Sequence, residues 1–436
     1  MAETSLNPLD DEAAALIRRR LVSIFGGSIG NLIEWYDFYI YNFFALYFAK
    51  AFFPGSDPTV QLLNTFAIYA LGFLIRPVGG WVLGIYADRK GRRAALTLSV
   101  TLMCIGSLMI GVMPTYASIG LGAPLLLLLA RLIQGISLGG EYGTSATYLS
   151  EVATSRHRGF YSSFQYVTLI GGQLIASMVL LVMQQLVSAP ELEAWGWRVP
   201  FLIGAVCALY GFYLRRNLAE TEDFKRASAV HRPSLIAELL KHPREIAIVF
   251  GLTMGGTLAF YTYTTYMPTF LVNTVKLTRN QATEISFVTL FIYMCLQPVY
   301  GAISDKVGRR PVLLWFGIMG TIGTAPILYT LMDTRDYTTA LLLVMAALLI
   351  VSGYTSINAV VKAELFPAGV RALGVGLPYA IAVSLFGGTA PLIGLWFKDI
   401  GHETWFFWYI TFVIFISLLV YGLMRDTRDH SRITPS

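Results

Sequence analysis

The sequence predicts an all-α membrane protein with twelve transmembrane helices in two six-helix bundles, and three observations lead to this fold class. Hydrophobic residues make up 55% of the 436 residues and charged residues only 13%, well below the charged share of soluble domains. Apolar runs recur along the whole chain, and each is long enough to cross a hydrocarbon core about 30 Å thick. Two sequence motifs recur half a chain apart, which indicates an internal duplication.

Twelve apolar stretches account for most of the chain. The first contains Glu34 and Asp37, which makes it a poor cleavable signal sequence, so we expect a retained helix. The expected spans are 21–48, 61–86, 94–113, 122–150, 162–187, 199–217, 246–272, 282–303, 312–331, 339–362, 371–395 and 405–424. They divide the chain into a cytoplasmic N-terminal segment (1–20), an N-terminal six-helix bundle (21–217), a cytoplasmic linker (218–245), a C-terminal six-helix bundle (246–424) and a cytoplasmic tail (425–436).

The positive charges indicate the orientation of the chain. Lys and Arg residues concentrate in every second loop between the spans, as they do in the cytoplasmic loops of membrane proteins. We therefore expect both termini in the cytoplasm, which requires an even number of helices. The same clustering argues against nucleic acid as a partner despite the net charge of +6. The expected surroundings are a lipid bilayer, and we expect a monomer.

Signatures of enzymes and metalloproteins are missing from the sequence. The three cysteines fall in apolar runs without a CxxC spacing, and all five histidines lie in loops or tails. A metal site, a disulfide framework or a nucleophile–histidine pair is therefore not expected. We expect no cofactor, and a proton carried inside the membrane must reside on carboxylates.

One motif occurs twice in the chain. Residues 84–93 and 301–310 both read G-x-x-x-D-[RK]-x-G-R-R, at the ends of the second and eighth spans. A second repeated pattern, a Glu seven residues before an Arg, follows the fourth and tenth spans at nearly the same offset. The candidate gating residues in these motifs are Gly84, Asp88, Arg89, Gly91, Arg92, Arg93, Glu151, Arg158, Gly301, Asp305, Arg309, Arg310, Glu364 and Arg371.

The chemistry of the repeated motif favours a gate. An acid at the end of one helix can face the positive N-terminus of a neighbouring helix and a nearby Arg. Gly84 and Gly301 permit close backbone approach. Such a cluster would hold the cytoplasmic face shut and break when the two halves rock. The alternative, that the arginines only determine topology, stays open for Arg93 and Arg310.

The repeated motif resembles the signature of the major facilitator superfamily, which lies in the loop between helices 2 and 3 and recurs between helices 8 and 9. This resemblance covers the whole chain. It implies two bundles related by a pseudo-two-fold axis that rock around a central cavity.

Charged side chains within the spans are candidates for function because they are costly in a bilayer. Arg76 and Arg131 suit an anionic substrate, since guanidinium groups bind carboxylates in bidentate fashion. The carboxylates Glu34, Asp37 and Glu141 are candidates for the coupled proton. Two alternatives remain open: structural ion pairs of Arg76 with Asp37 and of Arg131 with Glu141, and a Lys362 that extends to the cytoplasmic surface.

Lys362 ends a polar face of the tenth span and is a further substrate-binding candidate. Neutral polar side chains in the spans complete the set, although such groups are more often helix-packing residues than ligands. These candidates are Tyr69, Gln165, Tyr166, Tyr261, Thr265 and Asn358.

Further segments narrow the resemblance to the metabolite–proton symporter family. They are 31–38 (NLIEWYDF), 76–80 (RPVGG), 131–135 (RLIQG) and 139–143 (GGEYG). The family implies a bacterial inner-membrane location and no enzymatic activity. The segments most similar to carriers of α-ketoglutarate (2-oxoglutarate), which the resemblance implies are driven by proton symport, are 140–148, 159–161, 163–173, 260–262, 264–267, 362–364 and 366–367. The alternatives are citrate, tricarballylate, shikimate, an aromatic acid or a zwitterionic osmolyte.

One residue departs from that pattern. Pro268 directly follows the hydroxyl-rich patch of the seventh span. A proline at this position can reshape the outer end of the helix and alter selectivity.

Overall fold

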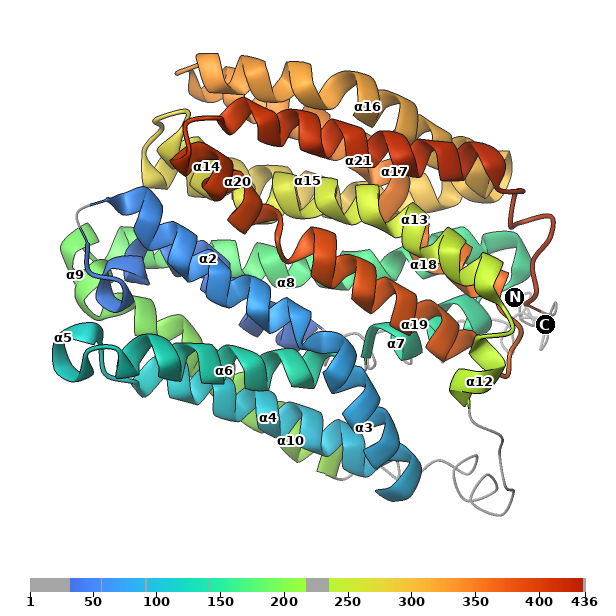
Figure 1. Cartoon of the computed structure of the whole chain (residues 1–436), viewed down its shortest axis with the longest axis horizontal. Helices are drawn as coiled ribbons and strands as arrows, with labels where there is room; N and C mark the ends of the chain where they lie inside the picture. The colour runs from blue at the N-terminus through green and yellow to red at the C-terminus, as the bar shows by residue number, and fades with distance from the viewer. Residues whose placement is uncertain (1–31, 56, 91, 140, 217–234, 434–436) are drawn as a thin grey trace, which may run out of the picture.

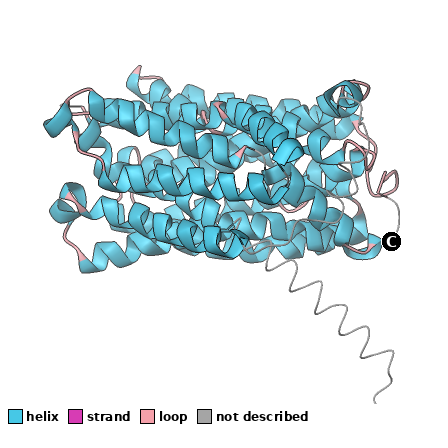
Figure 2. Ribbon diagram, turned by 90° about the horizontal axis from the view of Figure 1, so that it is seen from below, coloured by secondary structure: helices cyan, strands magenta, loops and turns pink. Residues whose placement is uncertain are grey.

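The structure is a computed structural model, and it describes residues 32–55, 57–90, 92–139, 141–216 and 235–433. Within these ranges all regular secondary structure is helical. The helices run along the long axis of the molecule, with the loops gathered at its two ends (Figure 2). Eight described helices are long and apolar enough to cross a membrane, and three shorter apolar helices and the helix 32–52 complete the twelve expected spans. The predicted twelve-helix membrane fold is confirmed.

The N-terminal half contains six of these spans. They are the helix 32–52, α2 (Pro58–Leu74) with α3 (Arg76–Lys90), α4 (Arg92–Val112), α6 (Gly122–Leu138) with α7 (Glu141–Val152), α8 (Arg158–Leu186) and α10 (Val199–Arg216). Short elements connect them, namely α5 (Tyr116–Ile119), η1 (Ser155–His157), α9 (Ala189–Ala194) and η2 (Gly196–Arg198).

The C-terminal half begins after the short helix α12 (Leu235–Leu239). Its spans are α13 (Pro243–Tyr261) with η3 (Thr262–Tyr266) and α14 (Met267–Asn273), α15 (Arg279–Val307), α16 (Arg309–Asp333), α17 (Tyr337–Thr355) with α18 (Asn358–Leu365), α19 (Arg371–Ala382) with η4 (Val383–Gly387) and α20 (Ala390–Asp399), and α21 (Glu403–Leu423). Most of the expected linker and the start of the first expected span lie outside the described residues, so the bundle limits stay a prediction.

The two halves form two layers that meet along the middle of the molecule. The N-terminal helices, blue to green, lie on one side and the C-terminal helices, yellow to red, on the other (Figure 1). The helix pairs that join the layers include α8 with α15, α2 with α20, and α7 with α19. We call the end that carries α12 and the last described residues the motif end, and the end that carries α5 and α9 the opposite end (Figure 1).

Five spans are interrupted along their length. α3 begins at Arg76, directly before Pro77, and α7 begins after two consecutive glycines. η3 and η4 are π-helical turns, and α18 starts after a short break that follows α17. Such interruptions inside a membrane protein are tolerated where they face a cavity or other protein, and they often mark a binding site.

Pro268 lies in the first turn of α14, directly after the π-helical turn η3. A proline is tolerated there because the first turn of a helix needs no N–H donor. The structure therefore accommodates Pro268 by a local change of helix type, while the span continues to Asn273.

Close backbone contact fixes the position of two candidate arginines. A Cβ added to Gly135 of α6 would overlap the carbonyl of Gly72 in α2, and one added to Gly139 would overlap the carbonyl of Arg76. Small residues at such contacts allow helices to approach closely in a membrane. The contact holds Arg76 of α3 and Arg131 of α6 on adjoining helices.

Candidate functional site

Arg76 lies in an aromatic environment at the centre of the molecule. Its guanidinium carbon is 3.7 Å from the ring centre of Phe73 and 4.4 Å from that of Phe38. The side chain is 5% exposed, and its Nε and Nη2 atoms have no hydrogen-bond partner. A buried cation with unused donors can bind an anion that enters the site.

Arg131 contacts the same phenylalanine. Its guanidinium carbon is 4.1 Å from the ring centre of Phe38 and 4.4 Å from that of Tyr41. Nη1 donates a hydrogen bond to Oε1 of Gln134 at 2.8 Å, whereas Nε and Nη2 have no partner. Phe38 thus contacts both guanidinium groups, which favours keeping two like charges in one site.

Asp37 is fully buried and is bonded to neutral side chains. Its Oδ2 accepts hydrogen bonds from Ser107 of α4 and, at 3.0 Å, from Nε2 of Gln134. The Arg76–Asp37 ion pair considered from the sequence does not form, because no carboxylate among the described residues lies within 4.0 Å of Arg76. Asp37 reaches Arg131 through Gln134 instead.

The other two carboxylate candidates are less fully described. Glu34 is buried in the helix 32–52, about one turn before Asp37. Glu141 is the first residue of α7, but its side chain lies outside the described residues, and so the Arg131–Glu141 pair stays untested.

Lys362 of α18 is fully buried and faces the centre of the molecule. Its Nζ donates a hydrogen bond to Oδ1 of Asn358 at 2.8 Å and to the hydroxyl of Tyr142 at 3.4 Å. The same atom is 4.0 Å from the ring centre of Tyr379 and 5.9 Å from that of Tyr354. The side chain therefore does not extend to the membrane surface, and that alternative is wrong.

A small cavity of about 20 Å³ lies between the two halves. Trp35, Arg76 and Tyr142 line it from the N-terminal half, and Tyr379 and Val383 from the C-terminal half. The rings of Tyr142 and Tyr379 stack with their centres 3.5 Å apart, and both contact Lys362. The cavity holds no more than a water molecule, so a substrate requires the halves to separate.

The remaining candidates lie around this centre. The Tyr261 hydroxyl is 3.5 Å from that of Tyr39, and the Tyr261 ring packs edge-on against Phe73. Tyr69 stacks on Tyr41, and Thr265 is buried on η3. Tyr166 and Gln165 are both buried on α8, and Nε2 of Gln165 has no hydrogen-bond partner.

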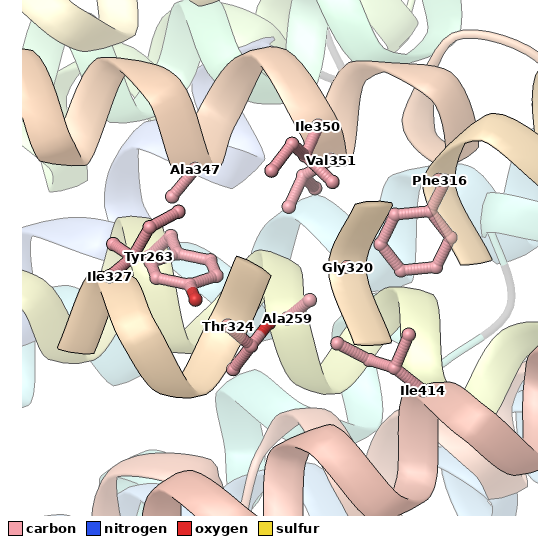
Figure 3. A pocket seen from close by; sticks show the side chains of 10 residues that line it. All are labelled: Ala259, Tyr263, Phe316, Gly320, Thr324, Ile327, Ala347, Ile350, Val351 and Ile414. Carbon is pink, nitrogen blue, oxygen red and sulfur yellow. The ribbon is translucent and has the colours of Figure 1, made fainter. Parts of the chain in front are cut away.

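The hydroxyl-rich patch of the seventh span points in two directions. Tyr261 faces the central aromatic residues, whereas Tyr263 points into the interior of the C-terminal bundle (Figure 3). There it lies with Thr324 of α16 and Val351 of α17 around a space that holds no water-sized cavity. That space is a packing region of one bundle and is separate from the central site.

At the motif end, the second copy of the repeated motif joins the two halves. Asp305 at the end of α15 accepts hydrogen bonds from the backbone N–H groups of Gly159 at 2.8 Å and Phe160 at 2.9 Å, at the N-terminus of α8. Arg309 donates to the same carboxylate at 2.8 Å. A Cβ on Gly301 would overlap the backbone of Gly159. The expected contact of an acid with a helix N-terminus and an Arg is present here.

Further charged residues complete the contact at this end. Glu364 is 3.9 Å from Nη1 of Arg158 and 3.7 Å from Nη2 of Arg309. Arg371 forms an ion pair with Glu151 of α7. Arg310 donates instead to the Tyr421 carbonyl at the end of α21, within its own half. The corresponding side chains of the first motif copy, Gly84, Asp88, Arg89, Gly91, Arg92 and Arg93, lie outside the described residues.

The C-terminal tail, residues 425–433, lies across this cluster. The backbone N–H of Arg432 donates to the Glu364 carbonyl at 2.9 Å, and Arg371 donates to the Arg432 carbonyl at 3.0 Å. Thr427 donates to the Glu364 carboxylate at 2.6 Å, and Ser431 accepts from Arg158 at 3.3 Å. The tail thus contacts residues of both halves.

Comparison with known proteins agrees with this architecture. Residues 24–234 match the family model "Sugar (and other) transporter", and residues 266–436 match the model of the Major Facilitator Superfamily. The alpha-ketoglutarate permease of Escherichia coli (strain K12) is 50% identical over 420 residues, which cover 96% of this chain and 97% of the permease. The chain belongs to the major facilitator superfamily.

Other members of the superfamily are more distant. The citrate-proton symporter of Salmonella typhi is 36% identical over 84% of each chain. The crystal structure of a D-xylose-proton symporter has a TM-score of 0.72 at 19% identity and covers 93% of this chain and 98% of its own. The first two matches show a transporter rather than an enzyme, and the xylose symporter shows the shared fold. This superfamily member is a multi-pass protein of the bacterial inner membrane.

Several residues of the centre were not among the sequence candidates. Tyr142, Tyr354 and Tyr379 surround Lys362, and Ser107 and Gln134 hold Asp37. Tyr142 and Gln134 lie within the segments that resemble the symporter family. That resemblance is the sequence signal by which these two residues could have been found. Tyr379 and Ser107 lie in apolar stretches without such a signal.

Proposed function

We propose that this transporter imports 2-oxoglutarate or a closely related dicarboxylate together with protons by alternating access. The observation that carries the proposal is the pair of buried cations at the centre: Arg76 lines the central cavity, and Lys362 lies against Tyr379, which lines the same cavity. Neither has a carboxylate within ion-pair distance among the described residues. A dianion that bound between them would meet both positive charges, which matches the chemistry of a dicarboxylate.

The proposed roles follow from this arrangement. Arg76 and Lys362 each bind one carboxylate, with Arg131 as a further cation in the N-terminal half. Side chains around the cavity contact the rest of the substrate, namely Tyr69, Gln165, Tyr166, Tyr261, Thr265 and Asn358. Asp37, with Glu34 and Glu141 as further candidates, carries the coupled proton. No cofactor is needed beyond the proton.

The proposed orientation places the motif end and both termini in the cytoplasm. The clustered cations of the loops at that end support this orientation. The cluster around Asp305 and Glu364 then forms the cytoplasmic gate between bundles 21–217 and 246–424. With this gate closed and a central cavity of about 20 Å³, the transporter is in a conformation that is closed toward the cytoplasm. We propose that it works as a monomer.

The alpha-ketoglutarate permease and the citrate-proton symporter support the organic-acid class of the substrate. A proline/betaine transporter of Salmonella typhimurium is 31% identical over 93% of this chain, which makes a zwitterionic osmolyte the second candidate. A zwitterion carries a single carboxylate and would leave one of the two central cations unmatched.

The proposal is tested by uptake of labelled 2-oxoglutarate into proteoliposomes, with and without an inward proton gradient. We expect the gradient to drive accumulation and a protonophore to abolish it. Succinate and citrate should compete more strongly than betaine. Uptake that does not depend on the gradient would contradict proton symport. Stronger competition by betaine than by the organic acids would contradict the dicarboxylate assignment.

A further inference from the structure

The side chain of Gln134 connects the proposed proton carrier to a buried cation. Its amide is fully buried on α6, with Oε1 bonded to Nη1 of Arg131 at 2.8 Å. Its Nε2 donates to Oδ2 of Asp37 at 3.0 Å and to the hydroxyl of Ser107 at 2.9 Å. No direct ion pair joins Asp37 and Arg131 in the described part of the chain, so the amide is their connection.

The chemistry of the partners fixes the direction of this amide. A guanidinium group only donates hydrogen bonds, and an ionised carboxylate only accepts them. The amide carbonyl must therefore face Arg131, and the amide NH₂ must face Asp37. An amide can satisfy both partners at once while remaining uncharged.

We propose that Gln134 is a positioning residue that holds Arg131 while Asp37 is ionised and releases it when Asp37 is protonated. The proposal rests on proton symport, the function proposed above. It assigns to Gln134 the coupling between the proton and the availability of Arg131 for the substrate carboxylate.

Protonation of Asp37 changes the donors and acceptors of the network. A proton on Oδ2 turns this atom into a donor, which the Ser107 hydroxyl can accept by rotating but the Gln134 NH₂ cannot. A proton on Oδ1, which has no hydrogen-bond partner, removes the charge that strengthens the bond from Gln134. Either way the bond from the amide to Asp37 weakens, and Oε1 is no longer held in place for Arg131.

Release of the amide leaves Arg131 with all its N–H groups available. Nε and Nη2 already have no partner, and Nη1 would join them. The proton comes from the gradient and leaves Asp37 when the site opens to the cytoplasm, so no other reactant is required. The substrate carboxylate then replaces Gln134 as the acceptor for Arg131.

Few other titratable or charged groups face Asp37. Among the described residues they are Arg131 from α6, Cys104 from α4, Cys207 from α10, and Tyr36 on the same helix. None of these is a second carboxylate or a lysine. Asp37 is therefore the group whose charge changes at this network when a proton binds.

The test compares Gln134→Met with a matched control variant. Methionine has nearly the same length but cannot join Asp37 to Arg131. Gln297→Met replaces an equally buried glutamine of α15 that is bonded to Thr355 and to the Tyr293 backbone. Each variant is purified, checked for monodispersity and reconstituted.

Three measurements separate coupling from folding: exchange of 2-oxoglutarate without a gradient, accumulation driven by the gradient, and the dependence of KM on external pH. Wild type should show a KM that rises with pH by about tenfold, the scale of one hydrogen bond to a charged group. Gln134→Met should keep exchange, lose that pH dependence and lose accumulation. Gln297→Met should keep all three properties.

Two outcomes would overturn the proposal. Gln134→Met with the pH profile and accumulation of wild type would show that the amide does not couple the two groups. Loss of exchange together with accumulation would show that Gln134 is structural, since it also fills the space beside Gly106. If wild-type uptake does not depend on the proton gradient, the proposed symport itself is refuted. This failure is distinguishable from the two outcomes for Gln134→Met.

Discussion

In the described part of the chain, the charged groups of Arg76 and Lys362 contact aromatic rings rather than carboxylates. Phe38 and Phe73 contact Arg76, and Tyr379 contacts Lys362. Ring faces attract cations but are weaker partners than a carboxylate in a site without water. An entering dianion can therefore displace these contacts and gain stronger ones.

The role of Lys362 can be tested with Lys362→Met, which preserves length but removes the charge. We expect KM for 2-oxoglutarate to rise about 10- to 100-fold, since a hydrogen bond to a charged group contributes about 1.5–3 kcal/mol. Exchange in proteoliposomes measures this KM. An analogue without the second carboxylate should inhibit wild type and variant equally.

A suitable control for that variant is Lys398→Met, at the other end of α20 from the centre, where Lys398 binds Glu403. It should leave KM unchanged. A KM for Lys362→Met equal to that of wild type would place the second carboxylate elsewhere.

The sequence identified the charged candidates within the spans, but it did not predict which residues they contact. The cost of charge in a bilayer was enough to select Arg76, Asp37 and Lys362. It did not predict that Asp37 would bind Gln134 instead of Arg76, because a partner depends on the rotation of each helix about its axis. That rotation is set by packing, such as the contact of Gly135 with Gly72.

At the scale of elements, α8 and α15 form a joint across the two halves. The N-terminus of α8 presents unpaired N–H groups and the positive end of the helix dipole, and Asp305 binds both Gly159 and Phe160 there. In the proposed transport cycle, the joint opens before a substrate leaves toward the cytoplasm. Its strength therefore affects the balance between closed and open states.

We expect Asp305→Asn to weaken this joint, because an amide loses the charge and presents an N–H group to a donor. Maleimide labelling of a cysteine placed at Ala146 in α7, in a chain without native cysteines, should become about tenfold faster. Asp336→Asn removes the charge of a helix cap at the opposite end, where Asp336 accepts from Thr339, and should not change labelling. Equal rates in all three proteins would contradict a gating role for Asp305.

The helices themselves were largely predictable, since their apolar length determines them. The break before Pro77 and the start of α7 after two consecutive glycines also had a signal in the sequence. The π-helical turns η3 and η4 had none, because one extra residue in a turn arises from packing around Tyr261 and Gly387 rather than from local preference. These turns determine the direction in which nearby side chains of the site point.

At the scale of the whole molecule, contacts close both ends of the central cavity. At the opposite end Arg279 of α15 binds Glu193 of α9 at 2.6 Å, and Gln184 of α8 binds Thr283 at 3.0 Å. At the motif end the C-terminal tail adds to the contacts between the halves. The molecule is thus shut on both sides, with more polar contacts at the motif end.

The contribution of the tail can be tested with a chain that ends at Met424. We expect its motif end to open more often, by about fivefold if the net loss equals about 1 kcal/mol, the typical value of one hydrogen bond. Distances between spin labels at His157 and Val307, on exposed positions of the two halves, report this opening. A chain that ends at Ile433 should match wild type, and a distance distribution unaffected by the longer truncation would contradict the prediction.

Docking of Thr427 and Arg432 on Glu364 and Arg371 has a practical consequence for work with this protein. A purification handle or fluorescent reporter fused to the C-terminus would load the same segment whose contacts join the two halves. Turnover measured with such a fusion would then reflect the attached cargo as well as the carrier.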